Sequence, residues 1–202
     1  MNAKTSFLTT TYRNSKELIN VAEKFITKNP YQLFKSINSV ISLKKPIKIF
    51  KSTNENKSHV MNKILSKIYH LSKTAEILIL GRNNFDYKKY FDLNDLVMLD
   101  DDIVTSKKYP SLKIKYLTVH RSKGLESDYV VLINADDNLF GFPNKIEDDE
   151  TIKLLLSKQN DYLYDEERRL FYVALTRTKK IVYIVTSKNN PSIFINEMKE
   201  YL

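Results

Sequence analysis

The chain has 202 residues, of which 33 are basic and 24 acidic, so its net charge is +9 and its pI is near 9.4. It contains no cysteine, which excludes disulfide bonds and thiolate metal sites, and it has no apolar run long enough for a membrane span or a signal peptide. The positive charge favours a polyanionic partner, nucleic acid before a membrane surface, although a solvated lysine-rich surface would have the same composition.

Hydrophobic periodicity predicts alternating helices and strands in the first half of the chain. After an extended segment at 7–12, Ser15 is predicted to cap a helix that ends at Asn29-Pro30. A lysine-rich connector at 31–46 follows. The remaining predicted elements are a strand at 47–50, an amphipathic helix at 56–72, a strand at 76–80 that ends at Gly81, and a short helix near 87–91.

The second half continues this alternation through an acidic loop, two strands, a long excursion, a helix, a strand and a last helix. Strands that alternate with helices predict an α/β fold, in which helices cover both faces of a mainly parallel sheet. We expect one domain over residues 1–202 and, with no membrane segment, a cytoplasmic location. The acidic loop is predicted at 100–102, the two strands at 114–119 and 129–134, and the partly helical excursion at 136–164, with a turn at 141–143. The helix is predicted at 165–180, the strand at 181–186 and the last helix at 192–201.

The predicted helix at 165–180, DEERRLFYVALTRTKK, organises the rest of the interpretation. Leu170, Val173, Ala174 and Arg177 fall at i, i+3, i+4 and i+7, so one helical face leads from aliphatic packing to a guanidinium. In the simplest interpretation, Arg177 and the two lysines after it complement the negative end of the helix dipole. The neighbouring motifs favour a second interpretation, in which Arg177 is held at the edge of the domain to contact a ligand.

The usual nucleotide-binding loops are absent. The glycines, Gly81, Gly124 and Gly141, lie too far apart to form either GxxxxGK[ST] or GxGxxG. The acidic clusters at 100–102 and 147–150 lack the spacing of a calcium loop, so they are predicted to be solvated loops and no metal ligand is assigned.

Three separated segments carry candidate ligand-binding side chains: Tyr12-Arg13, the stretch TVHRSKGLE at 118–126, and Thr176-Arg177. In a parallel sheet, segments that follow the strands meet at the carboxyl edge, where ligands bind. Arginine suits phosphate oxygens, an aromatic ring suits a purine, and a carboxylate can accept from ribose hydroxyls. The sequence therefore predicts a nucleotide-binding edge.

These stretches resemble, in the same order, the motifs in the second half of superfamily 1 helicases of the UvrD/Rep type. The resemblance runs from about Leu8 to Thr186 and rests on TTTYRNSKELINVAEKF, ILILGRNNF, YLTVHRSKGLESDYVVLINADD and EERRLFYVALTRTKK. The phrases HRSKGLESDYVVL, GFPNKIEDD and EERRLFYVALTR are most similar to the helicase IV branch. The resemblance implies a C-terminal RecA-like domain whose partner, an N-terminal RecA-like domain with the P-loop, is absent from this chain.

In such helicases ATP and Mg²⁺ lie between two RecA-like domains and are held mainly by the first, while the second supplies arginine fingers. The resemblance implies that Arg13 and Arg177 reach the γ-phosphate, that Tyr12 stacks on adenine, and that Glu126 binds the ribose, with Gly124 in the same nucleotide-facing stretch. It also implies contacts to single-stranded DNA from Thr118, His120, Arg82, Asn84 and Lys123.

Several of these residues have a structural alternative. Tyr12 could pack on the first helix, His120 could be a satisfied turn residue, and Lys123 could face DNA phosphate or solvent equally. Arg168 and Arg169 are expected to form salt bridges with nearby acids such as Glu166.

The chain departs from the family pattern in two ways. It contains no P-loop, and the interval of about a hundred residues between Tyr12-Arg13 and TVHRSKGLE is too short for the large helical subdomain of UvrD and Rep. We expect the second motor domain of an ATP-dependent DNA helicase that steps along a single strand, 3′ to 5′ as in the family. The alternatives are a non-catalytic nucleic-acid-binding module with the same fold and a domain whose basic face docks a protein partner.

Overall fold

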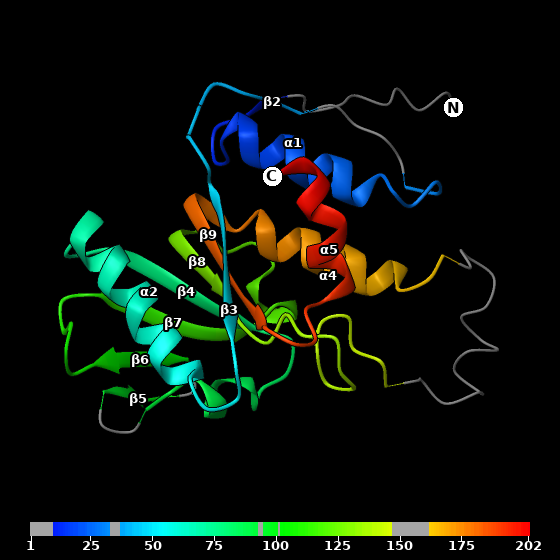
Figure 1. Ribbon diagram of the computed structural model, residues 1–202. Coiled ribbons are helices and arrows are strands. Elements are labelled where there is room, and N and C mark those ends of the chain that lie inside the picture. Colours follow the sequence, from blue (N-terminus) through cyan, green and yellow to red (C-terminus); the bar gives the residue numbers. More distant parts are fainter. Residues whose placement is uncertain (1–9, 33–36, 93–94, 101, 147–161) are drawn as a thin grey trace, which may run out of the picture.

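A computed structural model describes residues 10–32, 37–92, 95–100, 102–146 and 162–202 (Figure 1). Its centre is a seven-stranded sheet in the order β3-β9-β8-β4-β7-β6-β5. The five strands from β3 to β7 are parallel, and β6 and β5 continue the sheet as an antiparallel hairpin. The predicted α/β fold with a mainly parallel sheet is therefore confirmed. The sheet strands are β3 (Ile47–Ser52), β4 (Glu76–Gly81), β5 (Leu96–Met98), β6 (Ile103–Ser106), β7 (Lys113–Thr118), β8 (Ser127–Leu132) and β9 (Thr178–Ser187).

Helices cover both faces of this sheet. On one side lie α1, α4 and α5, and on the other lies α2 (Figure 1). Alternate residues of the strands point to the two layers: Leu78 and Leu80 pack with the first group, Ile77 and Ile79 with α2. The helices are α1 (Lys16–Ile26), α2 (Lys57–Leu71), α4 (Asp165–Leu175) and α5 (Ile193–Met198), with short 3₁₀ turns η1 (Asp86–Lys89), η2 (His120–Ser122) and η3 (Lys199–Tyr201).

A cluster of buried aromatic rings fixes the helical layer that carries α4. Phe171 of α4 lies 5.3 Å from Phe25 of α1, 5.4 Å from Phe194 of α5 and 5.1 Å from Phe142, measured between ring centroids. All four side chains are fully buried. Tilted and edge-to-face packing of this kind adds to the free energy of burial, so the position of α4 is set by three separate parts of the chain.

Most predicted elements are observed within a few residues of their expected bounds. Ser15 caps α1 as predicted, since its Oγ accepts a hydrogen bond from the Leu18 amide at 3.3 Å. Two features of the connecting segments were not predicted. The connector at 31–46 includes a two-residue strand, β2 (Asn38–Ser39), paired with β1 (Thr10–Thr11). Strands β5 and β6 form a hairpin, and Asp100 and Asp102 of the predicted acidic loop lie between them.

The predicted helix at 165–180 was too long. It ends at Leu175, and β9 begins at Thr178. Arg177 therefore lies in the link between a helix and a strand, not on a helical face. In the predicted excursion at 136–164, residues 136–146 form turns and no helix, and residues 147–161 lie outside the described part of the chain.

Candidate functional site

The residues predicted to face a nucleotide gather on one rim of the molecule, formed by Tyr12, Arg13, Glu126, Arg177 and Lys179. This rim lies at a different edge of the sheet from the carboxyl edge that was predicted. Glu126 directly precedes β8 and Arg177 precedes β9, so the rim lies at the amino ends of these strands. The expectation of a carboxyl edge was wrong because Arg13 follows β1, which pairs only with β2 outside the main sheet, and because the functional side chains come before their strands.

Glu126 is the centre of this rim. Its Oε2 accepts from Arg13 Nε at 2.6 Å, and its Oε1 lies 3.1 Å from Lys179 Nζ. All three side chains are between 34% and 43% exposed, so the pairs are at the surface. The hydrogen bond from Lys179, and then that from Arg13, lower the pKa of Glu126. Glu126 is thus a carboxylate at neutral pH, and its partners leave the rim with a positive excess.

Arg177 is half-buried beside this pair and forms no direct ion pair among the described residues, although the charge of Glu126 acts to raise its pKa. Its Nε donates to the Val173 carbonyl at 3.2 Å, and its Nη1 donates to the Leu125 carbonyl at 3.3 Å. Burial lowers the pKa of the guanidinium, and the nearby positive charge of Arg13 lowers it further. The main chain therefore fixes the direction of this group without neutralising it, which suits binding of an anion.

The position of Arg177 depends on a side chain far away in the sequence. Asn14 is buried, and its Nδ2 donates to the carbonyl oxygens of Thr176 at 3.1 Å and Thr178 at 2.8 Å. The Thr178 hydroxyl contacts the Asp128 carbonyl at 3.0 Å. Because Asn14 follows Arg13 directly, one short segment carries one arginine and holds the turn that carries the other.

Tyr12 and Gly124 are the remaining residues that were predicted to face a nucleotide. The Tyr12 side chain is 76% exposed and does not pack in the core, which disagrees with the alternative that it packs on the first helix. Gly124 is exposed and has a φ of +86°, a conformation that favours glycine. This lets the chain turn between η2 and Glu126.

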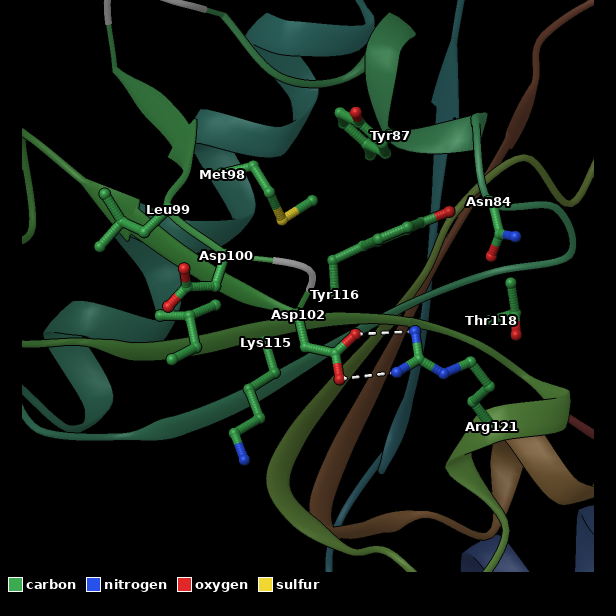
Figure 2. A pocket seen from close by; sticks show the side chains of 11 residues that line it. Asn84, Tyr87, Met98, Leu99, Asp100, Asp102, Lys115, Tyr116, Thr118 and Arg121 are labelled. Carbon is green, nitrogen blue, oxygen red and sulfur yellow. Dashed lines mark hydrogen bonds and ion pairs between the residues drawn. The ribbon is translucent and has the colours of Figure 1, made fainter.

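The residues predicted to contact DNA lie at the opposite edge of the sheet. Thr118 is the last residue of β7 and is paired in register with Gly81, the last residue of β4. His120 lies two residues after Thr118, and Asn84 lies three residues after Gly81; both His120 and Asn84 are exposed. Thr118 and Asn84 line the same hollow, which has a volume of about 1090 Å³ (Figure 2).

Arg82 and Lys123 differ from this group. The Arg82 guanidinium is paired with Glu167 of α4, at 2.8 Å from Nε and 2.7 Å from Nη2. Glu167 also accepts from the Asn144 amide at 2.9 Å, so Arg82 joins β4, α4 and the loop after β8. Lys123 is exposed at the end of η2.

Three other arginines form ion pairs. Arg168 and Arg169 do so as expected, but with other acids than the one named: Arg168 with Glu197, and Arg169 with Asp165 at 2.6 Å. Sequence reasoning missed Lys179 on the rim and the bidentate pair of Arg121 with Asp102 in the hollow that Thr118 and Asn84 also line. An intramolecular partner far away in the sequence leaves no local signal.

The acidic clusters show no metal centre within the described ranges, where no group of three or more His, Asp or Glu side chains is arranged to hold an ion. The cluster at 147–150 lies outside these ranges. No helix in the described part of the chain is long and apolar enough to cross a membrane.

Comparison with known proteins identifies the family. A family model of the UvrD-like helicase C-terminal domain matches residues 88–189, half of the chain. The chain belongs to this family. It is 33% identical over 194 residues to DNA helicase IV of Escherichia coli K12, covering 95% of this chain and 26% of that protein. It is 24% identical over 204 residues to ATP-dependent DNA helicase Rep of Buchnera aphidicola, covering 91% and 27%.

The UvrD-like chain therefore spans about a quarter of the length of these relatives. A crystal structure of the C-terminal domain of a possible DNA helicase from Lactobacillus plantarum WCFS1 has the same fold. Its TM-score is 0.54 at 11% identity, and the match covers 93% of this chain and 94% of that one. The likeness in structure supports the fold, and the family match places the chain among the C-terminal domains of UvrD/Rep-type helicases.

Proposed function

We propose that this chain is the second motor domain of an ATP-dependent DNA helicase that moves along single-stranded DNA. In this proposal residues 1–202 form one domain, and an N-terminal RecA-like domain of the same protein holds ATP and Mg²⁺ with its P-loop. This chain supplies the arginine fingers Arg13 and Arg177 from across the cleft. The observation that carries the proposal is the convergence of Arg13, Glu126 and Arg177, from three distant segments, on one exposed rim.

The charges of the rim fit a polyphosphate. Arg13, Arg177 and Lys179 are positive, and Glu126 is the one carboxylate paired with this group in the described part of the chain. Two guanidinium groups close enough for one to lower the pKa of the other gain stability when an anion lies between them. Bound ATP supplies the phosphoryl group that is transferred to water. The two arginines would neutralise the charge that develops on it, an effect worth about 10³ to 10⁵ in rate.

The remaining rim residues fit the rest of the nucleotide. Tyr12 offers an exposed phenol ring for stacking on adenine. Glu126 can accept from ribose hydroxyls, because each carboxylate oxygen has more than one acceptor site and only one is used by its cationic partner. Glu126 also holds Arg13 on the rim through their hydrogen bond.

Two short segments connect this rim to the edge that would bind the strand. Residues 119–126 run from the carboxyl end of β7, where Thr118 lies, to the amino end of β8, where Glu126 lies. Helix α4 carries Glu167, the partner of Arg82, in its first turn and ends two residues before Arg177. Helix α4 packs in the core through Phe171 and Leu175, and the first segment is anchored there by Val119. A displacement at the rim would therefore be passed to the strand contacts of Thr118, His120 and Asn84.

The proposal is tested by comparing the 202-residue chain with the full-length protein that contains it. The full-length protein should hydrolyse ATP, be stimulated by single-stranded DNA and separate a tailed duplex. The chain by itself should show negligible hydrolysis, because no residue in its sequence replaces a P-loop lysine. Substantial turnover by the purified chain would contradict the proposal, as would a full-length protein that binds DNA without hydrolysing ATP.

A further inference from the structure

A second binding feature lies where the β5–β6 hairpin meets β7. The hollow of about 1090 Å³ that touches Thr118 and Asn84 extends away from them along this hairpin (Figure 2). Such a volume reaches the upper end of the range for small-molecule sites, about 300–1,000 Å³. Its other wall combines Tyr116 and Arg121, from the stretch that begins YLTVHR, with residues outside the quoted motifs, chiefly Tyr87, Met98, Asp100, Asp102 and Lys115.

The apolar part of the hollow is built from closely packed aromatic rings. The rings of Tyr87 and Tyr116 lie 5.2 Å apart between centroids, nearly edge to face, and Phe91 packs on both. The Tyr116 hydroxyl donates to the Asn83 carbonyl at 2.6 Å. Gly81 makes room for this hydroxyl, because a Cβ added there would lie 2.4 Å from it. The aromatic wall is therefore preorganised, and the Met98 side chain lies beside it (Figure 2).

The polar part of the hollow is electrically balanced. Arg121 faces Asp102 in a bidentate pair, with Nη1–Oδ1 at 2.8 Å and Nη2–Oδ2 at 2.9 Å. Lys115 and Asp100 add one charge of each sign to the lining. The Asp102 backbone carbonyl also accepts from the Tyr116 amide at 2.8 Å, which ties the hairpin turn to β7. Two cations against two carboxylates give no net attraction for a phosphate, whereas they offer both donors and acceptors to a neutral planar group.

We infer that this hollow receives one unstacked base of the bound single strand. The inference rests on the proposed function, since it takes the strand to run past Thr118 and Asn84. The base would lie against the partly exposed Tyr87 ring and Met98, backed by the buried ring of Tyr116, with its polar edge toward Asp102 and Arg121. Every base has a π-face, so stacking here is tolerant of sequence and suits an enzyme that must travel over any DNA.

The position of the base can be mapped by photocrosslinking. Full-length protein is bound to a thymidine oligonucleotide that contains one 5-iodouracil, irradiated with long-wavelength ultraviolet light, and digested for mass spectrometry. The expected crosslinks are to Tyr87 or Met98. Crosslinks confined to Asn84, Thr118 and His120 would overturn the pocket but leave the strand-binding edge in place. Failure to bind or crosslink the oligonucleotide at all would overturn the proposed function and the pocket with it.

Filling the hollow provides an independent measurement. Met98→Trp should weaken oligonucleotide binding by about tenfold, the loss expected for one stacked base, and should remove the crosslink to Tyr87. Thr105→Trp is the matched control, because Thr105 lies on the same hairpin but lines a neighbouring hollow. Equal binding by Met98→Trp, Thr105→Trp and the unaltered protein would contradict the inference.

Discussion

Arg13 and Glu126, 113 positions apart in the sequence, are joined by a hydrogen bond of 2.6 Å between Nε and Oε2. The pair is partly exposed, and Lys179 contacts the other carboxylate oxygen at 3.1 Å. A surface pair of this kind contributes only about 0.2–1 kcal/mol to folding. Its significance is positional, because it holds one candidate finger, Arg13, next to the other, Arg177, on a rim that faces away from the core.

Glu126→Gln should affect nucleotide selection more than folding. We expect the preference for ATP over 2′,3′-dideoxy-ATP, measured as kcat/KM of the full-length protein, to fall by about tenfold, because hydrogen bonds from ribose to a charged acceptor are lost. Asp128→Asn is the control, since Asp128 forms a similar exposed pair with Lys180 at 3.2 Å. An unchanged preference in Glu126→Gln would show that this carboxylate does not contact the ribose.

Tyr12 offers a test of adenine stacking that is free of folding effects. Its ring is 76% exposed, so Tyr12→Ala should leave the thermal midpoint unchanged while raising the KM for ATP by about tenfold, the cost of one lost base stack. Tyr12→Phe should retain the low KM. Tyr31→Ala, at a tyrosine that is 62% exposed, serves as the control. The stacking role is wrong if the alanine and phenylalanine variants have the same KM.

The adjacent arginines Arg168 and Arg169 should differ sharply in their contribution to stability. Arg168 is 2% exposed, pairs with the partly exposed Glu197 and donates to the Phe25 carbonyl at 3.2 Å. Arg168→Ala leaves both acceptors without this partner and should cost about 3 kcal/mol. Arg169 pairs with Asp165 at the surface, and Arg169→Ala should cost about 0.3–0.5 kcal/mol. Urea denaturation of the two variants measures both values. Similar losses would mean that the burial of Arg168 does not decide its role.

The sequence was sufficient for the strands and helices with strong apolar patterns. In β4, β8 and α2 the apolar residues that form the pattern are the ones that the fold buries, so the pattern alone locates these elements. It was insufficient at α4. There the pattern predicted a helix to Lys180, but Asn14 donates to the carbonyls of Thr176 and Thr178 and the chain turns into β9. A contact across 162 positions has no periodic signal. The short β5–β6 hairpin was missed for a similar reason, since its strands have three and four residues.

The candidate site was predictable by residue type but not by location. The motifs named Arg13, Glu126 and Arg177, and the structure brings these three together. The same motifs placed them at the carboxyl edge of the sheet with the strand contacts, whereas they lie at the amino ends of β8 and β9. Which edge a residue occupies depends on whether it precedes or follows its strand. Arg177 precedes its strand in the predicted and in the observed arrangement, so the order of the elements already favoured the amino edge.

The central claim is that Arg177 acts on the nucleotide and not on DNA. Its most direct measurement is single-turnover ATP hydrolysis by full-length Arg177→Ala, with single-strand binding measured on the same sample and Arg169→Ala as the control. We predict that hydrolysis falls by about 10³ or more while the affinity for single-stranded DNA stays close to that of the unaltered protein. Hydrolysis near the unaltered rate in Arg177→Ala would contradict the account.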